Sequence, residues 1–173
     1  MTNNPGSPAT VPLSHVAPDG TARMVDVGDK PITARSATAE GFVRISPDLA
    51  RAFRESTVTK GSVLEIVRLA GILAAKRTDE LIPLCHTLPL DAVDVLATLE
   101  DGRVRVTATV RTQSRTGVEM EALTAVSVAC LTVIDMGKAI DKGMVIEGVR
   151  VLEKHGGRSG SYTTAPTPPE GRP

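Results

Sequence analysis

The sequence has very few aromatic residues: no tryptophan, one tyrosine and two phenylalanines among 173 residues. Single-stranded nucleic acid is bound largely by stacking its bases on aromatic rings, so this scarcity argues against a single-strand reader. The chain also has no excess charge of one sign, because 20 lysines and arginines balance 20 aspartates and glutamates. A strong general attraction to nucleic acid or to an anionic membrane is therefore not expected.

Cysteines and long hydrophobic runs are scarce as well. The two cysteines, Cys85 and Cys130, stand alone in apolar surroundings without metal-ligand spacing, which is typical of buried free thiols in a cytosolic protein. No apolar run reaches the roughly 18 residues of a membrane span. Residues 1–8 lack the basic start and the apolar stretch of a signal peptide. A cytoplasmic protein is therefore expected.

The two ends differ in composition from the middle of the chain. Residues 1–13 and 161–173 are rich in proline, glycine, serine and threonine, so both are expected to be disordered tails. Residues 14–160 are expected to form a single catalytic domain. Hydrophobic residues make up 41% of the chain but few are aromatic, so alanine, valine, leucine and isoleucine must build the core.

Periodicity within the domain predicts a mixture of strands and helices. Strands are predicted at residues 24–27, 33–46, 93–99, 103–110 and 145–152, and helices at 47–54, 62–76 and from 116 through the charged run near 138. Two capping boxes, Ser62 with Glu65 and Thr116 with Glu119, mark the starts of the long helices. This order favours an α+β fold of ferredoxin-like type, with an antiparallel sheet and the helices packed on one face.

The end of the last helix carries the first candidate for chemistry. Residues 122–134 contain no charge, and Asp135, Lys138 and Lys142 follow on one helical face, with Glu121 on the same stripe four turns earlier. A lysine beside an apolar wall can have a depressed pKa, and a neighbouring aspartate can fix its position. The pattern indicates an acid–base centre, although ordinary charge at a helix C-terminus explains it about equally well.

Three cationic positions near glycines are candidates for binding anions. The segment from Lys154 to Gly160 contains two consecutive glycines and Arg158, which suits phosphate oxygens, although its spacing is not that of a P-loop. Lys60 precedes a glycine at the start of a predicted helix, where backbone N–H groups favour an anion. The alternatives are a flexible exit into the tail for the first segment and a solvated loop lysine for the second.

Two further polar positions suggest a ring-binding role. His86 lies in a stiff segment between Pro83 and Pro89, where it could contact a substrate oxygen, move a proton or be purely structural. Glu121 could accept hydrogen bonds from a guanidine-like heterocycle edge, whereas Glu119 is expected to point away. No second histidine lies close to His86 in the sequence, so a zinc pair is not indicated. With the scattered cations, these positions suit a small polyanionic substrate with a polar ring.

At these positions the chain resembles the cyclic pyranopterin monophosphate synthase family, the molybdenum cofactor biosynthesis protein C family. The resemblance spans roughly residues 14–160. Its most specific segments are Leu84-Cys85-His86, Thr116-Gly-Val-Glu-Met-Glu-Ala122 and Asp135-Met-x-Lys138, and further matches are Met24-Val-Asp-Val, Lys60-Gly and Gly156-Gly-x-Ser-Gly160.

The resemblance implies a reaction and an assembly. The implied lyase converts (8S)-3',8-cyclo-7,8-dihydroguanosine 5'-triphosphate into cyclic pyranopterin monophosphate and pyrophosphate, for molybdenum cofactor biosynthesis. The implied assembly is a homo-hexamer, a trimer of dimers with the active site at the dimer interface. No nucleic-acid or membrane partner is expected. No cofactor is expected to be obligatory: Mg²⁺ could accompany the leaving pyrophosphate, but no dedicated metal-ligand cluster is evident in the sequence.

The resemblance also implies roles by position. Asp135 and Lys138 would form the catalytic pair, with Lys138 as general acid or base, and Lys60 would lie near the reacting centre. Substrate binding would involve Leu84, Cys85, His86, Met120, Glu121, Lys154 and Arg158. Two positions depart from the family: Gly137 stands where cysteine is common, which we expect to cause no loss, and Arg158 where lysine is common. Arginine keeps the charge for phosphate but gives up no proton at neutral pH, so proton transfer at Arg158 is in doubt.

Two other functions are compatible with the sequence. A non-catalytic domain that binds a nucleotide-like small molecule would explain the anion sites but gives no reason for a buried Asp–Lys pair. A structural subunit of a larger complex would explain the mostly apolar helix at 62–76. That helix suits an interface under all three hypotheses, so turnover of the cyclised nucleotide is the observation that separates them.

Overall fold

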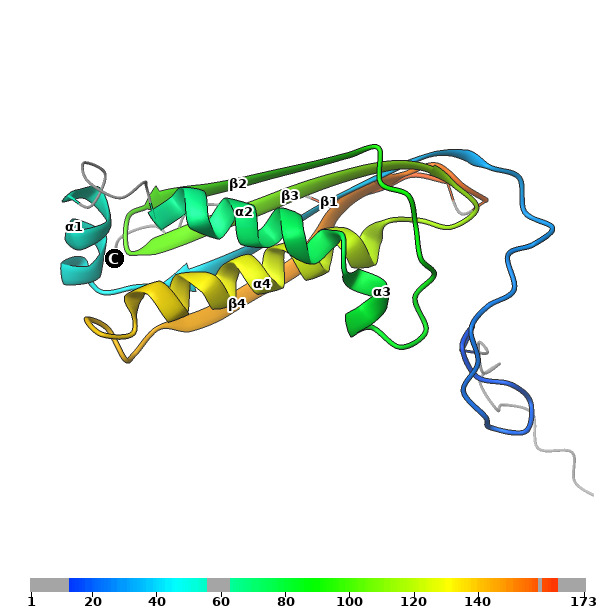
Figure 1. Ribbon diagram of the computed structural model, residues 1–173, viewed down its shortest axis with the longest axis horizontal. Helices are drawn as coiled ribbons and strands as arrows, with labels where there is room; N and C mark the ends of the chain where they lie inside the picture. The colour runs from blue at the N-terminus through cyan, green and yellow to red at the C-terminus, as the bar shows by residue number, and fades with distance from the viewer. Residues whose placement is uncertain (1–12, 56–62, 159, 165–173) are drawn as a thin grey trace, which may run out of the picture.

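The computed structural model describes residues 13–55, 63–158 and 160–164, and its centre is an antiparallel sheet with helices on one face (Figure 1). The strands are β1 (Thr33–Arg44), β2 (Ala92–Glu100), β3 (Arg103–Ser114), β4 (Val145–His155) and β5 (Tyr162–Thr163). The helices are α1 (Pro47–Glu55), α2 (Val63–Ala75), α3 (Thr78–Leu81) and α4 (Glu119–Gly137). The Lys60 site, the capping box at Ser62 and most of the two predicted tails fall outside the described residues.

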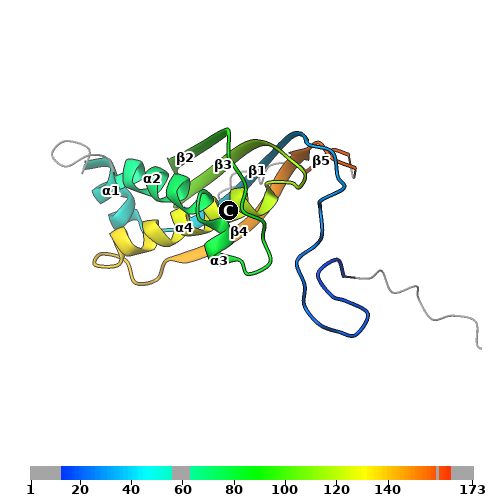
Figure 2. The same ribbon diagram turned by 45° about the vertical axis from the view of Figure 1, so that its right-hand side comes forward.

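The strand order is β2-β3-β1-β4-β5, and every neighbouring pair is antiparallel. The β2–β3 hairpin places β3 beside β1, and α4 then carries the chain across to β4 on the other side of β1. A second view shows the two long helices, α2 and α4, on the same face of the sheet (Figure 2). The ferredoxin-like α+β prediction is therefore confirmed.

Small aliphatic side chains fill the space between the sheet and the helices. The core-facing residues of β3 are fully buried, as their alternation predicted: Val104, Val106, Ala108 and Val110. Helix α4 comes so close to β1 that a Cβ on Gly41 would lie 2.6 Å from Val126. The core is therefore packed by bringing the backbones of helix and sheet close together, without large aromatic side chains between them.

Helix α4 is a core helix, although it is long and apolar enough to cross a membrane. Its mean hydropathy is 1.5, and half of it is buried within the protein. Its buried apolar positions are Ala122, Ala125, Val126, Ala129, Cys130 and Val133. These side chains are covered by protein, because α4 packs against the sheet and against α2.

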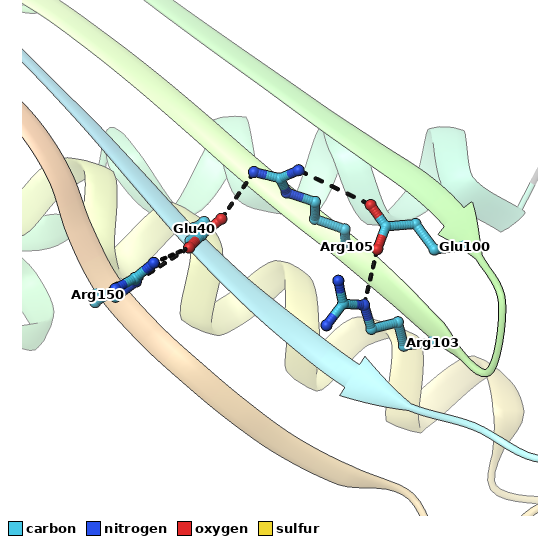
Figure 3. A network of polar contacts seen from close by, with 5 residues as sticks. All are labelled: Glu40, Glu100, Arg103, Arg105 and Arg150. Atoms are coloured by element: carbon cyan, nitrogen blue, oxygen red, sulfur yellow. Dashed lines mark hydrogen bonds and ion pairs between the residues drawn. The ribbon is translucent and has the colours of Figure 1, made fainter. Parts of the chain in front are cut away.

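The sheet face away from the helices carries an ion-pair network (Figure 3). Glu40 on β1 is completely buried, yet Oε2 accepts a hydrogen bond from Arg105 at 2.8 Å and Oε1 accepts one from Arg150 at 2.9 Å. Arg103 lies over the Phe42 ring at 4.1 Å from its centroid. Because a buried carboxylate needs charged partners, the network ties β1 to both neighbouring strands.

Two predictions about α4 are wrong. The capping box at Thr116 is not formed, because Val118 is the N-cap residue and no side chain caps the first turn. The helix ends at Gly137, whose carbonyl accepts the N–H of Ile140 and so closes a tighter last turn. Lys142 therefore does not continue the helical face of the preceding charged residues.

Three short segments also differ from the sequence predictions. Residues 24–27 form no strand, because their backbone does not join the sheet. The four-residue helix α3 was not predicted. Strand β5 lies where the sequence suggested a tail, and it forms because Tyr162 pairs with Lys154 and Thr163 with Glu153.

Candidate active site

A cavity of about 340 Å³ lies where the first turn of α4 faces the loop between α3 and β2. Five of the predicted substrate-binding residues line this cavity: Leu84, Cys85, His86, Met120 and Glu121. The segment before β1 forms another part of its wall, including His15, Val25 and Lys30. We call it the ring cavity. The fold thus brings together residues that are far apart in the sequence.

Glu121 is the unusual group in the ring cavity. Only 4% of the residue is exposed, and its Oε2 is buried without a hydrogen-bond partner among the described residues. Burial raises the pKa of Glu121 to about 7, and the negative charges of Glu119 and Asp79 add to the effect. Leaving a buried carboxyl oxygen unbonded costs free energy, so this oxygen is suited to the N–H donors of a ligand.

The pKa values of both cysteine thiols are raised by burial. Cys130 is buried in α4, where burial raises its pKa to about 12. Cys85 is only half-buried, and burial together with the negative charges of Glu121 and Asp79 raises its pKa. The predicted burial is therefore confirmed for Cys130 and only partial for Cys85. A thiol with a raised pKa is a weak nucleophile, so Cys85 serves as a wall of the ring cavity.

A larger cavity of about 710 Å³ adjoins the ring cavity and shares Lys30, Thr116, Gly117 and Glu119 with it. Its lining contains five basic side chains: Lys30, Arg35, Arg115, Lys154 and Arg158. We call it the basic cavity. Two of the five, Lys154 and Arg158, are the predicted phosphate contacts. A polyanion is the ligand that such a concentration of positive charge favours.

Glycines shape the wall of the basic cavity. Gly156 and Gly157 both have positive φ values, of 92° and 80°. A Cβ on Gly156 would lie 2.3 Å from the carbonyl oxygen of Ala34, and one on Gly157 would lie 2.0 Å from Arg35 Nη1. The turn after β4 therefore packs directly on β1 and on the Arg35 guanidinium, which no larger residue would allow.

Glu119 connects the two cavities. Its Oε1 lies 3.2 Å from Lys154 Nζ, so an α4 carboxylate holds a β4 ammonium at the shared wall. The prediction that Glu119 points away from the site is wrong. Reasoning from helical faces alone missed the contact, because Lys154 comes from a strand 35 residues further along the chain.

The predicted catalytic pair lies at the opposite end of α4. Lys138 Nζ donates to Asp135 Oδ1 at 2.6 Å, but the two side chains are 67% and 68% exposed. Asp135 follows Glu121 by fourteen residues, which is about 21 Å of α-helix. Within one chain, the pair is therefore solvated and separate from both cavities. Lys60 falls outside the described residues.

Comparison with known proteins decides the family. The MoaC family model matches residues 24–157. The chain belongs to the MoaC family. It is 58% identical over 156 residues to the cyclic pyranopterin monophosphate synthase of Methylobacterium sp. (strain 4-46), covering 89% of this chain and 98% of that protein. Against the Streptomyces avermitilis protein of the same name, identity is 55% over 159 residues, covering 92% and 94%.

Three cations of the basic cavity escaped the sequence reasoning: Lys30, Arg35 and Arg115. They form one chain of contacts, because Arg115 Nε donates to the Lys30 carbonyl at 3.1 Å and Arg35 Nη2 donates to the Arg115 carbonyl at 3.3 Å. These bonds join residues 80 and 85 positions apart. The one signal in the sequence is that these residues lie near the predicted start of β1 and just after β3, which are neighbouring antiparallel strands.

Gly137, the position at which the family resemblance implies that cysteine is common, is closely packed in this structure. A Cβ at this position would lie 2.6 Å from Leu49 Cδ2 and 3.2 Å from Met144 Cε. The end of α4 thus rests against α1 and against the residue before β4. In this chain a cysteine at Gly137 would require its neighbours to move.

Proposed function

We propose that the two adjoining cavities hold one substrate, with its ring in the ring cavity and its phosphates in the basic cavity. As a member of the MoaC family, the chain is an enzyme of molybdenum cofactor biosynthesis and catalyses the cyclic pyranopterin monophosphate synthase reaction. The proposed substrate is (8S)-3',8-cyclo-7,8-dihydroguanosine 5'-triphosphate. The products are cyclic pyranopterin monophosphate and pyrophosphate.

The single observation that carries this proposal is the unpartnered Glu121 oxygen beside a cavity lined with cations. In the proposed complex Glu121 accepts hydrogen bonds from the guanine-derived ring, and Met120, Leu84 and Cys85 pack against it. Binding of these N–H donors favours the ionised carboxylate, because hydrogen bonds to the charged form lower a pKa. His86 is the second polar contact of the ring.

The basic cavity stabilises the leaving group in this proposal. Pyrophosphate departure concentrates negative charge, and preorganised cations lower the free energy of the transition state. Arg158 contributes charge and bidentate geometry but no proton. No three His, Cys, Asp or Glu side chains of the described residues lie close enough to hold a metal ion. No resident cofactor is assigned, and any Mg²⁺ would enter on the substrate phosphates.

Proton transfer is assigned to Lys138, oriented by Asp135, with Lys60 near the reacting centre. Because Lys138 lies about 21 Å or more along α4 from the Glu121 end, one chain does not bring both to one substrate. A second copy running in the opposite direction would place its Lys138 beside the first copy's ring cavity. This is the reason to propose a composite site at a dimer interface, within a hexamer of three dimers in the cytoplasm.

Exposed apolar side chains support assembly through the helices. Leu69 and Leu73 on α2 are 56% and 52% exposed, and Leu131, one turn before Asp135 on α4, is 57% exposed. These positions fit the interface that the apolar helix at 62–76 suggested. Covering them would also remove water from around the Asp135–Lys138 pair, which would provide the low-dielectric wall that this pair lacks in the single chain.

Mixing two inactive variants tests the composite site. Glu121→Ala and Lys138→Ala chains, unfolded together and refolded as mixed oligomers, are expected to regain about a quarter of wild-type pyrophosphate release, because half of random dimers carry one intact site. The matched control refolds each variant alone. No recovery in verified mixed oligomers would place Glu121 and Lys138 of one chain in the same site and contradict the proposal.

The alternative function is a non-catalytic nucleotide-binding domain. Purified protein incubated with the cyclised nucleotide is expected to release stoichiometric pyrophosphate together with cyclic pyranopterin monophosphate. Binding of the nucleotide without pyrophosphate release would support the alternative and overturn the enzyme assignment. The MoaC-family match and the basic cavity next to Glu121 favour turnover.

A further inference from the structure

Residues 13–27 form an arm that leaves the sheet before β1. Figures 1 and 2 show it, in dark blue, extending away from the body of the protein. The arm folds back on itself through an isolated bridge between Val16 and Ala22, and the Arg23 N–H donates to the His15 carbonyl at 2.9 Å. The arm is therefore an ordered loop with its own hydrogen bonds.

The arm is also a wall of the ring cavity. Ser14, His15, Val25 and Val27 line this cavity together with Met120 and Glu121 of α4. Val25 and Val27 are half-buried, whereas the residues around them are exposed. The inner side of the arm thus shields the space next to the buried Glu121 oxygen.

One side-chain hydrogen bond holds the arm against the opposite wall. His86 Nε2 lies 2.9 Å from the carbonyl oxygen of Val25, across 61 residues of sequence. A carbonyl oxygen only accepts, so Nε2 must carry the proton. In the neutral imidazole the other nitrogen, Nδ1, is then an acceptor.

We infer that His86 is the positioning residue that ties the base of the arm to the wall of the ring cavity, and that it offers the substrate an acceptor at Nδ1 rather than a donor. This inference rests on the proposed function and specifies how the site reads its ring. Nε2 is occupied by Val25, so Nδ1 is the nitrogen left for a ligand.

The two hydrogen-bond acceptors in the ring cavity determine which edge of a ligand ring can bind there. The Glu121 carboxylate and His86 Nδ1 both require N–H donors, and the pyrimidinone edge of a guanine-derived ring supplies them from its ring N–H and its 2-amino group. An adenine-type edge presents an acceptor at the corresponding ring nitrogen. An adenine-type ring would leave the buried Glu121 oxygen and the half-buried His86 Nδ1 without a donor.

Two substitutions separate the functions of the two nitrogens. In His86→Gln the amide N–H₂ sits near the position of Nε2 and can still donate to Val25, whereas in His86→Asn the shorter amide cannot reach it. Hydrogen–deuterium exchange of the arm amides, measured on the full chain without substrate, is expected to be roughly fivefold to tenfold faster in His86→Asn. In His86→Gln it is expected to match wild type.

Exchange in β1 and β3 controls for folding, since both strands should keep wild-type protection in both variants. Wild-type arm exchange in His86→Asn would show that Nε2 does not hold the arm. Equal acceleration in both variants would also overturn the inference. Because neither measurement uses substrate, failure here leaves the pyrophosphate assay as a separate test of the proposed function.

The tautomer is measured on the wild type, so the inference stays testable even if a variant misfolds. ¹⁵N spectra of histidine-labelled protein are expected to show a protonated Nε2 and a bare Nδ1 for His86, identified by the signals missing in His86→Gln. The reverse tautomer would contradict the inference. GTP, which carries the same ring edge, is expected to slow arm exchange and ATP is not; equal protection by both would contradict the donor-edge selection.

Discussion

Replacing Lys138 by alanine is expected to reduce pyrophosphate release by about 10²- to 10⁴-fold, the usual contribution of a general acid or base. Lys138 is bonded to Asp135 at 2.6 Å, and their side chains are about two-thirds exposed in the single chain. An exposed ion pair of this kind contributes little to the stability of a chain. The variant should therefore unfold at the wild-type denaturant concentration while single-turnover pyrophosphate release is lost.

Lys142→Ala is the matched control, because this exposed lysine lies four residues further on and beyond the end of α4. It should keep activity within a few-fold of wild type. Asp135→Asn should fall between the two, because it retains hydrogen-bonding geometry but removes the charge that orients the ammonium. Normal turnover by Lys138→Ala would remove Lys138 from the mechanism.

Replacing Glu121 by glutamine is expected to change how stability depends on pH. The pKa of Glu121 is about 7 in the folded protein against an ordinary 4.5, so ionising it opposes folding. At low pH the protonated Glu121 side chain favours the folded state. This stabilisation is lost as the pH rises from about 4.5 to about 7. Between pH 5 and 8, wild type should lose about 2 to 3 kcal/mol of unfolding free energy relative to Glu121→Gln.

Urea unfolding of substrate-free protein at pH 5 and pH 8, at one fixed protein concentration, measures this difference. Glu80→Gln is the control, because Glu80 is an exposed carboxylate on the neighbouring α3 and its substitution should leave the pH dependence unchanged. Parallel pH profiles for wild type and Glu121→Gln would mean that the Glu121 carboxyl has a hydrogen-bonding or charged partner in the assembled protein. That result would contradict the conclusion that Glu121 Oε2 has no partner.

The strands and long helices of this protein follow from local patterns. β3 alternates Val104, Val106 and Val110 with polar residues, so its apolar face is the one that packs against the helices. The Glu100-Asp-Gly turn then fixes its pairing with β2. Residues 24–27 are also mostly apolar but form no strand, and the Val25 carbonyl accepts a hydrogen bond from His86 instead of joining the sheet.

The site was only partly predictable. His86 and Glu121 stood out because their types, spacing and family resemblance pointed to ring binding, and the fold places both on one cavity. Lys30 and Arg35 did not stand out, and Glu119 was expected to point away, because their contacts are with residues far along the chain. The Asp135–Lys138 hydrogen bond was predicted, but its exposure was not, because helical spacing shows which residues are neighbours and not what covers them.

The sequence by itself determined the order of the main elements, the ferredoxin-like sheet and the small-residue core, and it singled out five residues that line the ring cavity. These depend on hydrophobic periodicity and residue type, which act over a few positions. Tertiary structure alone decided that Glu121 is buried and unpaired, that Lys154 meets Glu119, and that His86 ties down the arm. Each of these is a matter of desolvation or of contact across tens of residues, which depends on how separate segments pack together.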